Sequence, residues 1–288
     1  VSQRVEDILD TYNRKNVDFI FGAASFLSPG ELLVKQSDKK DQVVRAKKTI
    51  IAVGTVPYHP PDIEFDGNCI LDSDSILSLD KIPDSMAVYG GGVIGCEYAS
   101  IFALLGVKVH LIDTRGTLLS FLDREISIIL ADILKQCGIN LLLGETYETI
   151  KSNRSTVQTV LKSGTRVETS TLLYANGRQG TAEQLNLKNC GLELNSRNQL
   201  NVNHNYQTEN PNIYAIGDVI GFASLVSVSN EEGRLAASHA VLKTDVKRVT
   251  GDIPYGIYTI PEISSIGLTE KELTVQKVPY EVGRAQVK

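Results

Sequence analysis

Residues 86–113 read MAVYGGGVIGCEYASIFALLGVKVHLID, and this stretch decides the fold. A short apolar run ends in the glycines Gly90, Gly92 and Gly95, which have the spacing G-x-G-x-x-G. A helix-like segment follows, and a second apolar run then ends at Asp113. A strand, a glycine-rich turn, a helix and another strand within about 30 residues are typical of a parallel sheet with helical crossovers.

The three glycines of this turn have separate physical reasons. The first permits a tight turn, the second lets a pyrophosphate approach the backbone, and the third lets the helix pack close to the strand. Val93 and Ile94 lie at the start of the helix, where backbone amides and the helix dipole favour phosphate charge. The stretch therefore predicts a dinucleotide-binding loop rather than only a tight turn.

Two charged residues follow the second strand, and they favour different nucleotides. Asp113 suits the free 2′-hydroxyl of NAD, because a carboxylate at this position accepts a hydrogen bond from the ribose. Arg115 can pair with the 2′-phosphate of NADP, although an arginine in such a loop can also be merely solvated. The preference between NAD and NADP stays open at this point.

The rest of the chain continues this alternation and adds antiparallel pieces. The predicted elements are a strand and hairpin over 18–36, a strand buried on both faces over 48–53, strands over 86–90, 107–113, 139–144, 171–177 and 212–218, helices over 93–105, 124–137 and 230–242, and an antiparallel ribbon over 147–169. We therefore expect an α/β fold containing a Rossmann-like dinucleotide-binding domain, whose parallel sheet carries an antiparallel ribbon.

Charge and hydropathy exclude several classes of partner. The 288 residues have a net charge of -5, and acidic and basic residues are interspersed without a polybasic stripe. We therefore exclude nucleic acid and anionic membrane surfaces as main partners. No apolar run approaches the roughly 20 residues that span a bilayer.

Cysteines and histidines are scattered along the chain. Cys69, Cys96, Cys137 and Cys190 show no C-x-x-C spacing, so we expect reduced thiols and a cytoplasmic protein. The four histidines form no motif typical of a metal site, and we predict none.

The opening residues, VSQRVEDILDTYNRK, have the pattern of an amphipathic helix rather than of a cleavable signal. The first residue is Val1 instead of methionine. We therefore expect the chain to begin inside a longer protein.

Four motifs carry a family resemblance. TIIAVGTVP at 49–57, YGGGVIGCE at 89–97, LLYANGR at 172–178 and NIYAIGDV at 212–219 occur in this order. The order resembles that of the pyridine nucleotide-disulfide oxidoreductase-like flavoproteins. The resemblance implies FAD and the nicotinamide nucleotides NAD(H) and NADP(H) as cofactors, and a partial FAD-binding domain beside the Rossmann-like domain.

The resemblance also implies roles for individual residues. Gly217 and Asp218 would bind the ribityl chain of FAD, although Asp218 can also be a helix or turn cap. Gly54 and Thr55 belong to the junction between the FAD and nucleotide domains.

Two further residues are assigned to the nicotinamide by the same resemblance. Glu97 would lie near the nicotinamide, and Gly177 would contact it through its backbone. No catalytic side chain is assigned with them. A helix that starts near Ser229 would direct its dipole at the flavin N1 and C2 carbonyl.

Within the family, several stretches resemble the soluble (Si-specific) pyridine nucleotide transhydrogenases. They include DSDSILSL at 72–79, LIDTR at 111–115, SFLDREIS at 120–127, GIYTIPEISSIG at 256–267 and VPYEVGRAQ at 278–286. Disulfide reductases usually continue with Pro-Asn after the Gly-Arg pair, whereas this chain continues with residues 179–181, Gln-Gly-Thr. We expect reversible hydride transfer from NADPH to NAD through FAD, with a dihydrolipoyl dehydrogenase-like disulfide reductase and a non-catalytic nucleotide-binding module as alternatives.

The resemblance also divides the chain. It assigns 1–80 to part of an FAD-binding domain and its connection, 81–205 to the NAD(P)-binding domain, 206–250 to a return segment of the FAD domain, and 251–288 to the start of a C-terminal dimerisation domain. An earlier G-x-G-x-x-G for FAD and most of that last domain are missing from the sequence. We therefore expect the fragment alone to be inactive and its parent to be a homo-oligomer.

Overall fold

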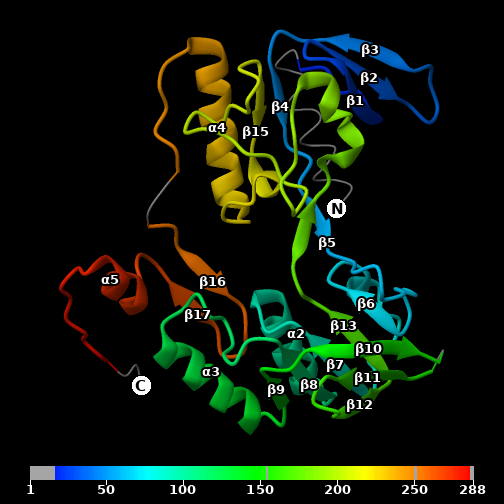
Figure 1. Cartoon of the computed structure of the whole chain (residues 1–288), viewed down its shortest axis with the longest axis vertical. Coiled ribbons are helices and arrows are strands. Elements are labelled where there is room, and N and C mark those ends of the chain that lie inside the picture. Colours follow the sequence, from blue (N-terminus) through cyan, green and yellow to red (C-terminus); the bar gives the residue numbers. More distant parts are fainter. Residues whose placement is uncertain (1–16, 154, 250–251, 286–288) are drawn as a thin grey trace. The chain divides into compact units, whose positions relative to one another are not determined.

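The computed structural model describes residues 17–153, 155–249 and 252–285 (Figure 1). The helix predicted at the start of the chain lies outside the described residues. The chain forms two units: unit 1 contains Val1–Thr55 and Gln179–Val249, and unit 2 contains Val56–Arg178 and Thr250–Lys288.

The bounds of these units do not coincide with the domain boundaries expected at 80/81 and 205/206, which stay predictions. The strand β6 (Ile70–Asp72) is hydrogen-bonded into the main sheet of unit 2, which extends this unit toward the N-terminus. The 3-10 helices η2 (Ala182–Leu185) and η3 (Leu187–Cys190) pack into the core of unit 1. Backbone pairing and core packing therefore place these segments in their units.

Unit 2 is built on a five-stranded parallel sheet in the order β6-β13-β7-β8-β9. Its other strands and its first two helices are β7 (Ser85–Tyr89), α2 (Val93–Leu104), β8 (Lys108–Asp113), α3 (Arg124–Gln136), β9 (Asn140–Leu143) and β13 (Thr171–Tyr174). The predicted strand and helix alternation is confirmed, with ends that differ by only a few residues.

The two faces of this sheet are covered by different structures (Figure 1). From β7, Met86 and Val88 pack into a core that includes α2 and α3. The alternating Ala87 and Tyr89 pack instead with the ribbon of β10 (Tyr147–Ser152), β11 (Val157–Leu161) and β12 (Arg166–Thr169). A parallel strand buried on both faces has a continuous apolar run, which explains the sequence MAVY.

The C-terminal segment of unit 2 carries β16 (Tyr255–Ile257), β17 (Ile263–Ser265) and α5 (Glu270–Gln276). Thr269 caps α5, because its side chain accepts a hydrogen bond from the Glu272 N–H while the Glu272 side chain reaches back to the cap. Ile257 is buried in the same core as α2 and α3. This segment is therefore anchored to the nucleotide-binding unit by apolar packing.

Unit 1 combines a hairpin sheet with a small parallel pair. β1 (Ala23–Ser28), β2 (Glu31–Lys35) and β3 (Gln42–Arg45) are antiparallel, as the predicted hairpin requires. β4 (Thr49–Ile51) pairs with β15 (Ile213–Ala215) in parallel. β5 (Thr55–Pro57) and β14 (Arg178–Gly180) lie where the chain passes between units.

The expectation that residues 48–53 are buried on both faces is wrong. Ile51 is buried, but Ile50 is 37% exposed and Val53 is 41% exposed. Ile51 packs into the core of unit 1, whereas the adjacent Ile50 points to the opposite face of the strand pair, which the described residues leave partly exposed.

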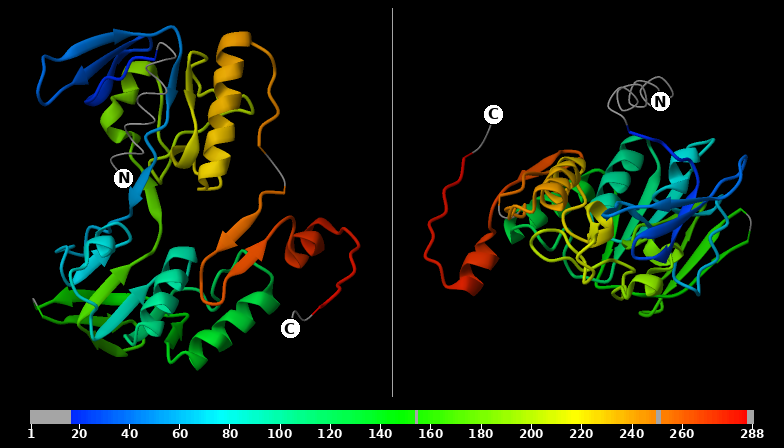
Figure 2. Two further views of the ribbon diagram at one scale, coloured as in Figure 1. Left: turned by 180° about the vertical axis from the view of Figure 1, so that it is seen from behind. Right: turned by 90° about the horizontal axis from the view of Figure 1, so that it is seen from above.

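A long helix follows β15 in unit 1. It is α4 (Val226–Leu242), which begins four residues before the predicted start at Asn230. The Tyr214 hydroxyl lies 2.9 Å from His239 Nδ1, and this contact joins β15 to the last turns of α4. Figure 2 shows α4 as the long helix coloured from yellow to orange. The short 3-10 helix η4 (Gly217–Ile220) precedes α4 in the chain, so the N-terminus of α4 comes soon after the turn that contains Asp218.

Candidate dinucleotide-binding site

The glycine turn after β7 is shaped by close backbone contacts. Gly90 has φ +120°, and a Cβ there would lie 2.6 Å from the Ala175 carbonyl oxygen. A Cβ on Gly95 would lie 1.7 Å from the Gly90 carbonyl oxygen. Both positions therefore need glycine for the fold itself, the first for its turn and the second for the close packing of α2.

Gly92 differs from these two glycines. It is the N-cap of α2, and a Cβ there would have no heavy atom within 4 Å. The first hydrogen bond of the helix runs from the Cys96 N–H to the Gly92 carbonyl oxygen at 2.9 Å. By helix geometry, the amides of Val93 and Ile94 have no partner within the helix, so the space before Gly92 is open to an anion.

Asp113 ends β8 directly beside this turn, and its side chain is only 2% exposed. Its Oδ2 accepts the Gly91 N–H and, at 2.8 Å, Arg115 Nη2. Its Oδ1 accepts the Arg115 N–H at 2.6 Å and Arg115 Nε at 3.0 Å. Two predicted site residues, Asp113 and Arg115, are therefore joined to each other.

The same contacts set the charge of this carboxyl group. Burial alone would raise the pKa of Asp113, but hydrogen bonds from the Arg115 side chain and from the backbones of Arg115 and Gly91 outweigh it. The pKa of Asp113 is therefore held below its ordinary value, and the carboxylate is ionised at neutral pH.

Gly91 was not predicted as a site residue. A Cβ there would lie 2.8 Å from Asp113 Oδ2 and 2.7 Å from Leu118 Cδ2. Only a glycine lets the buried carboxylate reach this backbone N–H. The signal was present in the three consecutive glycines 90–92, since the fingerprint itself requires only two of them.

The residues assigned to the nicotinamide lie in separate contacts. Glu97, on α2, accepts the Tyr258 N–H at 2.8 Å through Oε1. Gly177 has φ +103°, and its carbonyl oxygen accepts the Tyr58 N–H at 3.1 Å. Both residues therefore help to hold neighbouring segments of unit 2 in place.

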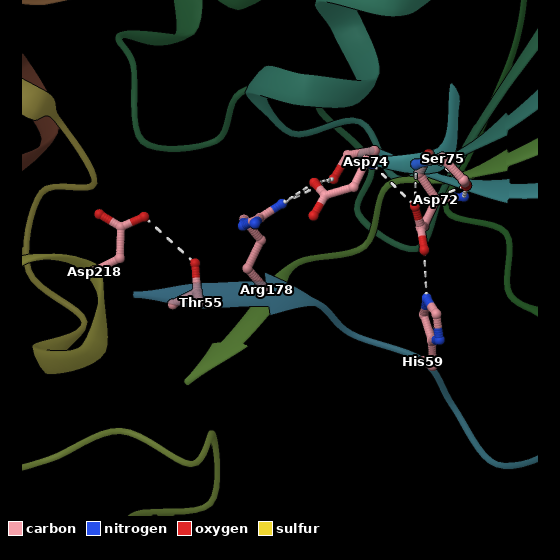
Figure 3. Close-up of polar contacts among 8 residues, drawn as sticks. Thr55, His59, Asp72, Asp74, Ser75, Arg178 and Asp218 are labelled. Carbon is pink, nitrogen blue, oxygen red and sulfur yellow. Dashed lines mark hydrogen bonds and ion pairs between the residues drawn. The ribbon is translucent and has the colours of Figure 1, made fainter. Parts of the chain in front are cut away.

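The residues assigned to FAD gather in unit 1. Thr55 Oγ1 lies 3.4 Å from Asp218 Oδ2, and Figure 3 shows the two side chains directed toward each other. The Gly54 carbonyl oxygen accepts the Thr181 N–H at 3.3 Å. Gly217 precedes Asp218 with φ +71°, so the turn after β15 also depends on glycine.

A buried acid behind this turn was also missed from the sequence. Glu232, on α4, is fully buried and accepts the Gly217 N–H at 2.7 Å through Oε2. Its Oε1 has no hydrogen-bond partner among the described residues. Burial raises the pKa of Glu232 more than the Gly217 N–H lowers it. No sequence motif distinguishes it from its partly exposed neighbour Glu231.

A polar cluster lies at the end of β6 in unit 2 (Figure 3). His59 Nε2 lies 2.7 Å from Asp72 Oδ2, while Ser75 Oγ donates to Asp72 Oδ1 at 2.8 Å. The serine and the histidine bind different oxygens, so they do not form the serine-histidine contact of a hydrolase. Arg178 Nη1 also pairs with Asp74 at 2.8 Å. The cluster therefore ties the connecting segments to the sheet.

The cysteines do not form a reactive pair in this structure. None of the four is in a disulfide, and burial raises the pKa of Cys96 to about 12. Such a thiol stays protonated at neutral pH.

Metal sites and membrane spans were sought in residues 17–153, 155–249 and 252–285. In these ranges, no three or more His, Cys, Asp or Glu side chains gather where they could hold a metal ion. The helices in the same ranges lack the length and apolar character that a membrane-spanning helix needs.

The chain is similar in sequence to bacterial proteins that share the same name. It is 49% identical over 96% of its length to a soluble pyridine nucleotide transhydrogenase of Vibrio cholerae, and 50% identical over 96% to one of Photorhabdus laumondii. It spans only 59% and 60% of these two relatives.

Solved structures share the fold at lower identity. LpdA of Mycobacterium tuberculosis matches 96% of the chain with a TM-score of 0.88 and 26% identity, and the chain covers 61% of it. The flavoprotein disulfide reductase RclA of Escherichia coli matches 95% with a TM-score of 0.82 and 27% identity, and 64% of it is covered. Residues 2–240 match the family described as pyridine nucleotide-disulphide oxidoreductase. The chain therefore belongs to the pyridine nucleotide-disulphide oxidoreductase family.

Proposed function

We propose that the whole protein transfers hydride reversibly between NADPH and NAD by way of FAD, with one nicotinamide leaving before the other binds. The observation that carries this proposal is the 49% identity to soluble pyridine nucleotide transhydrogenases over 96% of the chain. The similarity to the disulfide reductase RclA stands at 27% identity. The family fold and the open glycine turn support nucleotide binding as the basis of the activity.

The residues of unit 2 would bind and orient the nicotinamide nucleotide. The open N-terminus of α2 at Gly92 would hold the pyrophosphate through backbone amides. Asp113 and Arg115 would contact the adenine-side ribose, where the two nucleotides differ. Glu97 and Gly177 would lie near the nicotinamide, Gly177 through its backbone.

The residues of unit 1 would bind the flavin. Asp218 would accept hydrogen bonds from the ribityl hydroxyls, with Thr55 beside it at 3.4 Å and Gly54 and Gly217 shaping the backbone. The N-terminus of α4 at Val226 would stabilise negative charge on the flavin ring. These residues would hold FAD, which when bound would supply the hydride-transfer chemistry.

Stopped-flow absorbance of the flavin in the whole protein tests this function. NADPH is mixed first and NAD second, and a thiol-blocking reagent is present throughout. Rapid reduction by NADPH followed by rapid reoxidation by NAD is expected, because hydride exchange between nicotinamides needs no thiol. Failure of NAD to reoxidise the flavin would contradict the proposal.

A disulfide reductase is the second candidate function, because the fold is shared with RclA at a TM-score of 0.82. This reaction needs a redox-active dithiol, and the buried Cys96 is not suited to that role. Turnover of a disulfide substrate that thiol blocking abolishes, together with slow reoxidation by NAD, would favour the reductase. The chain by itself is expected to bind NADH or NADPH without turnover.

A further inference from the structure

The carboxylate of Asp113 is fully occupied in this structure. A carboxylate offers about four acceptor positions on its two oxygens. Oδ1 accepts the N–H and Nε of Arg115, and Oδ2 accepts the Gly91 N–H and Arg115 Nη2. A ribose hydroxyl that is to donate to Asp113 must therefore displace one of these four donors.

The four donors are not equally able to leave. Two are backbone N–H groups of Gly91 and Arg115, which the glycine turn and the end of β8 hold in place. The other two belong to the Arg115 guanidinium. The Arg115 side chain is 44% exposed whereas that of Asp113 is 2% exposed, so the guanidinium can move into solvent without unfolding the turn.

We propose that Arg115 is a movable cover over Asp113, and that NAD and NADP displace it in different ways. The ribose hydroxyls of NAD take the place of the guanidinium on Asp113. The 2′-phosphate of NADP instead keeps Arg115 as its own partner, since guanidinium and phosphate pair in bidentate geometry. This proposal rests on the proposed function and identifies the residue pair that balances the two nucleotides.

The cover has opposite consequences for the two nucleotides. NAD must break an ion pair to reach Asp113, and a partly exposed pair of this kind lowers affinity by about two- to fivefold. NADP gains a charged contact, and losing such a hydrogen-bonded contact weakens binding by about 10- to 100-fold. Removing the guanidinium should therefore tighten NAD binding while it weakens NADP binding.

The test measures the affinities of the 288-residue chain for NADH and NADPH by nucleotide fluorescence, in wild type and three variants. Arg115→Ala removes the guanidinium that covers Asp113. Arg115→Lys keeps the positive charge but cannot form the bidentate contact. Arg166→Ala, at an exposed position on β12, is the matched control for the loss of one positive charge. Circular dichroism checks that each variant is folded.

The expected result is a two- to fivefold tighter NADH complex and a 10- to 100-fold weaker NADPH complex for Arg115→Ala, as estimated above. Arg115→Lys should recover part of the NADPH affinity, and Arg166→Ala should leave the ratio of affinities unchanged. If Arg115→Ala weakens the binding of NADH and NADPH equally, or leaves the ratio of their affinities unchanged, the role of Arg115 as a cover is contradicted, but the proposed function is not. A wild-type chain that binds neither nucleotide would overturn the cover and the nucleotide site of the proposed function together.

Discussion

The turns after β7 and β15 share a local pattern, but the aspartates associated with them make different contacts. Each follows a parallel strand, contains a glycine with positive φ, and is associated with an aspartate. In unit 2, Asp113 is saturated by four donors, whereas in unit 1 Asp218 makes a long 3.4 Å contact with Thr55. The carboxylate of Asp113 is therefore fully occupied, whereas the carboxylate of Asp218 makes one long contact.

The supports behind the two turns differ as well. The turn of unit 2 depends on steric contacts, because Gly90 and Gly95 lie against backbone atoms. The turn of unit 1 depends on a hydrogen bond from the Gly217 N–H to the buried Glu232. A similar local sequence pattern is therefore stabilised by packing in unit 2 and by a buried polar contact in unit 1.

The largest effect is expected from Gly95→Ala. The new methyl group would lie 1.7 Å from the Gly90 carbonyl oxygen, so α2 would have to move away from β7. We expect a loss of about 3 kcal/mol or more in the free energy of unfolding, together with loss of NADH binding. Denaturant unfolding and fluorescence titration measure the two effects. A variant that keeps its stability would show that this contact does not hold the turn.

Gly92→Ala should affect nucleotide binding but not folding, in contrast to Gly95→Ala. Its methyl group would enter open space at the helix N-terminus, so the stability should change by less than about 1 kcal/mol. The affinity for NADH should nevertheless fall by about tenfold or more, because the methyl group lies where a pyrophosphate must approach. The same two measurements are used as for Gly95→Ala. Unchanged affinity would place the pyrophosphate elsewhere.

The smallest effect is expected in unit 1, from Glu232→Gln. Because burial raises the pKa of Glu232, its ionisation disfavours the folded state as pH rises above the pKa of the unfolded chain. Glutamine keeps an acceptor for the Gly217 N–H but cannot ionise. We expect the thermal stability of the variant relative to wild type to increase as the pH rises above about 4, the ordinary pKa of a glutamate in an unfolded chain.

Glu231→Gln, at the partly exposed neighbouring position, is the control for that pH series. Its pKa is lowered by the Arg234 side chain, so loss of its charge should not produce a gain that grows with pH. A pH-independent difference between wild type and Glu232→Gln would show that the buried carboxyl is not destabilised by ionisation.

Much of the fold could be predicted from local sequence. The apolar strands and the glycine spacing were sufficient to locate β7, α2 and β8, because these elements depend on short-range pattern and burial. The exposure of Ile50 and Val53 could not be predicted, since it depends on which distant segments pack on each face of β4. The position of β6 in the main sheet is likewise a long-range pairing.

The site could be predicted only in part. Residue types and spacing indicated the turn and the pair Asp113 and Arg115, but they treated the two residues as competing for a nucleotide. Their direct ion pair is a property of side-chain geometry. Glu232 could not be found, because its burial depends on the packing of α4 against the turn at Gly217.

The most direct test of the account is amide hydrogen exchange of the chain with and without saturating NADPH. The account predicts new protection in the peptides that cover residues 90–97 and 113–119, where the open amides of α2 and the Asp113–Arg115 pair lie. Protection that appears only in unit 1, or none at all despite measured binding, would contradict the assignment of the nucleotide to this turn.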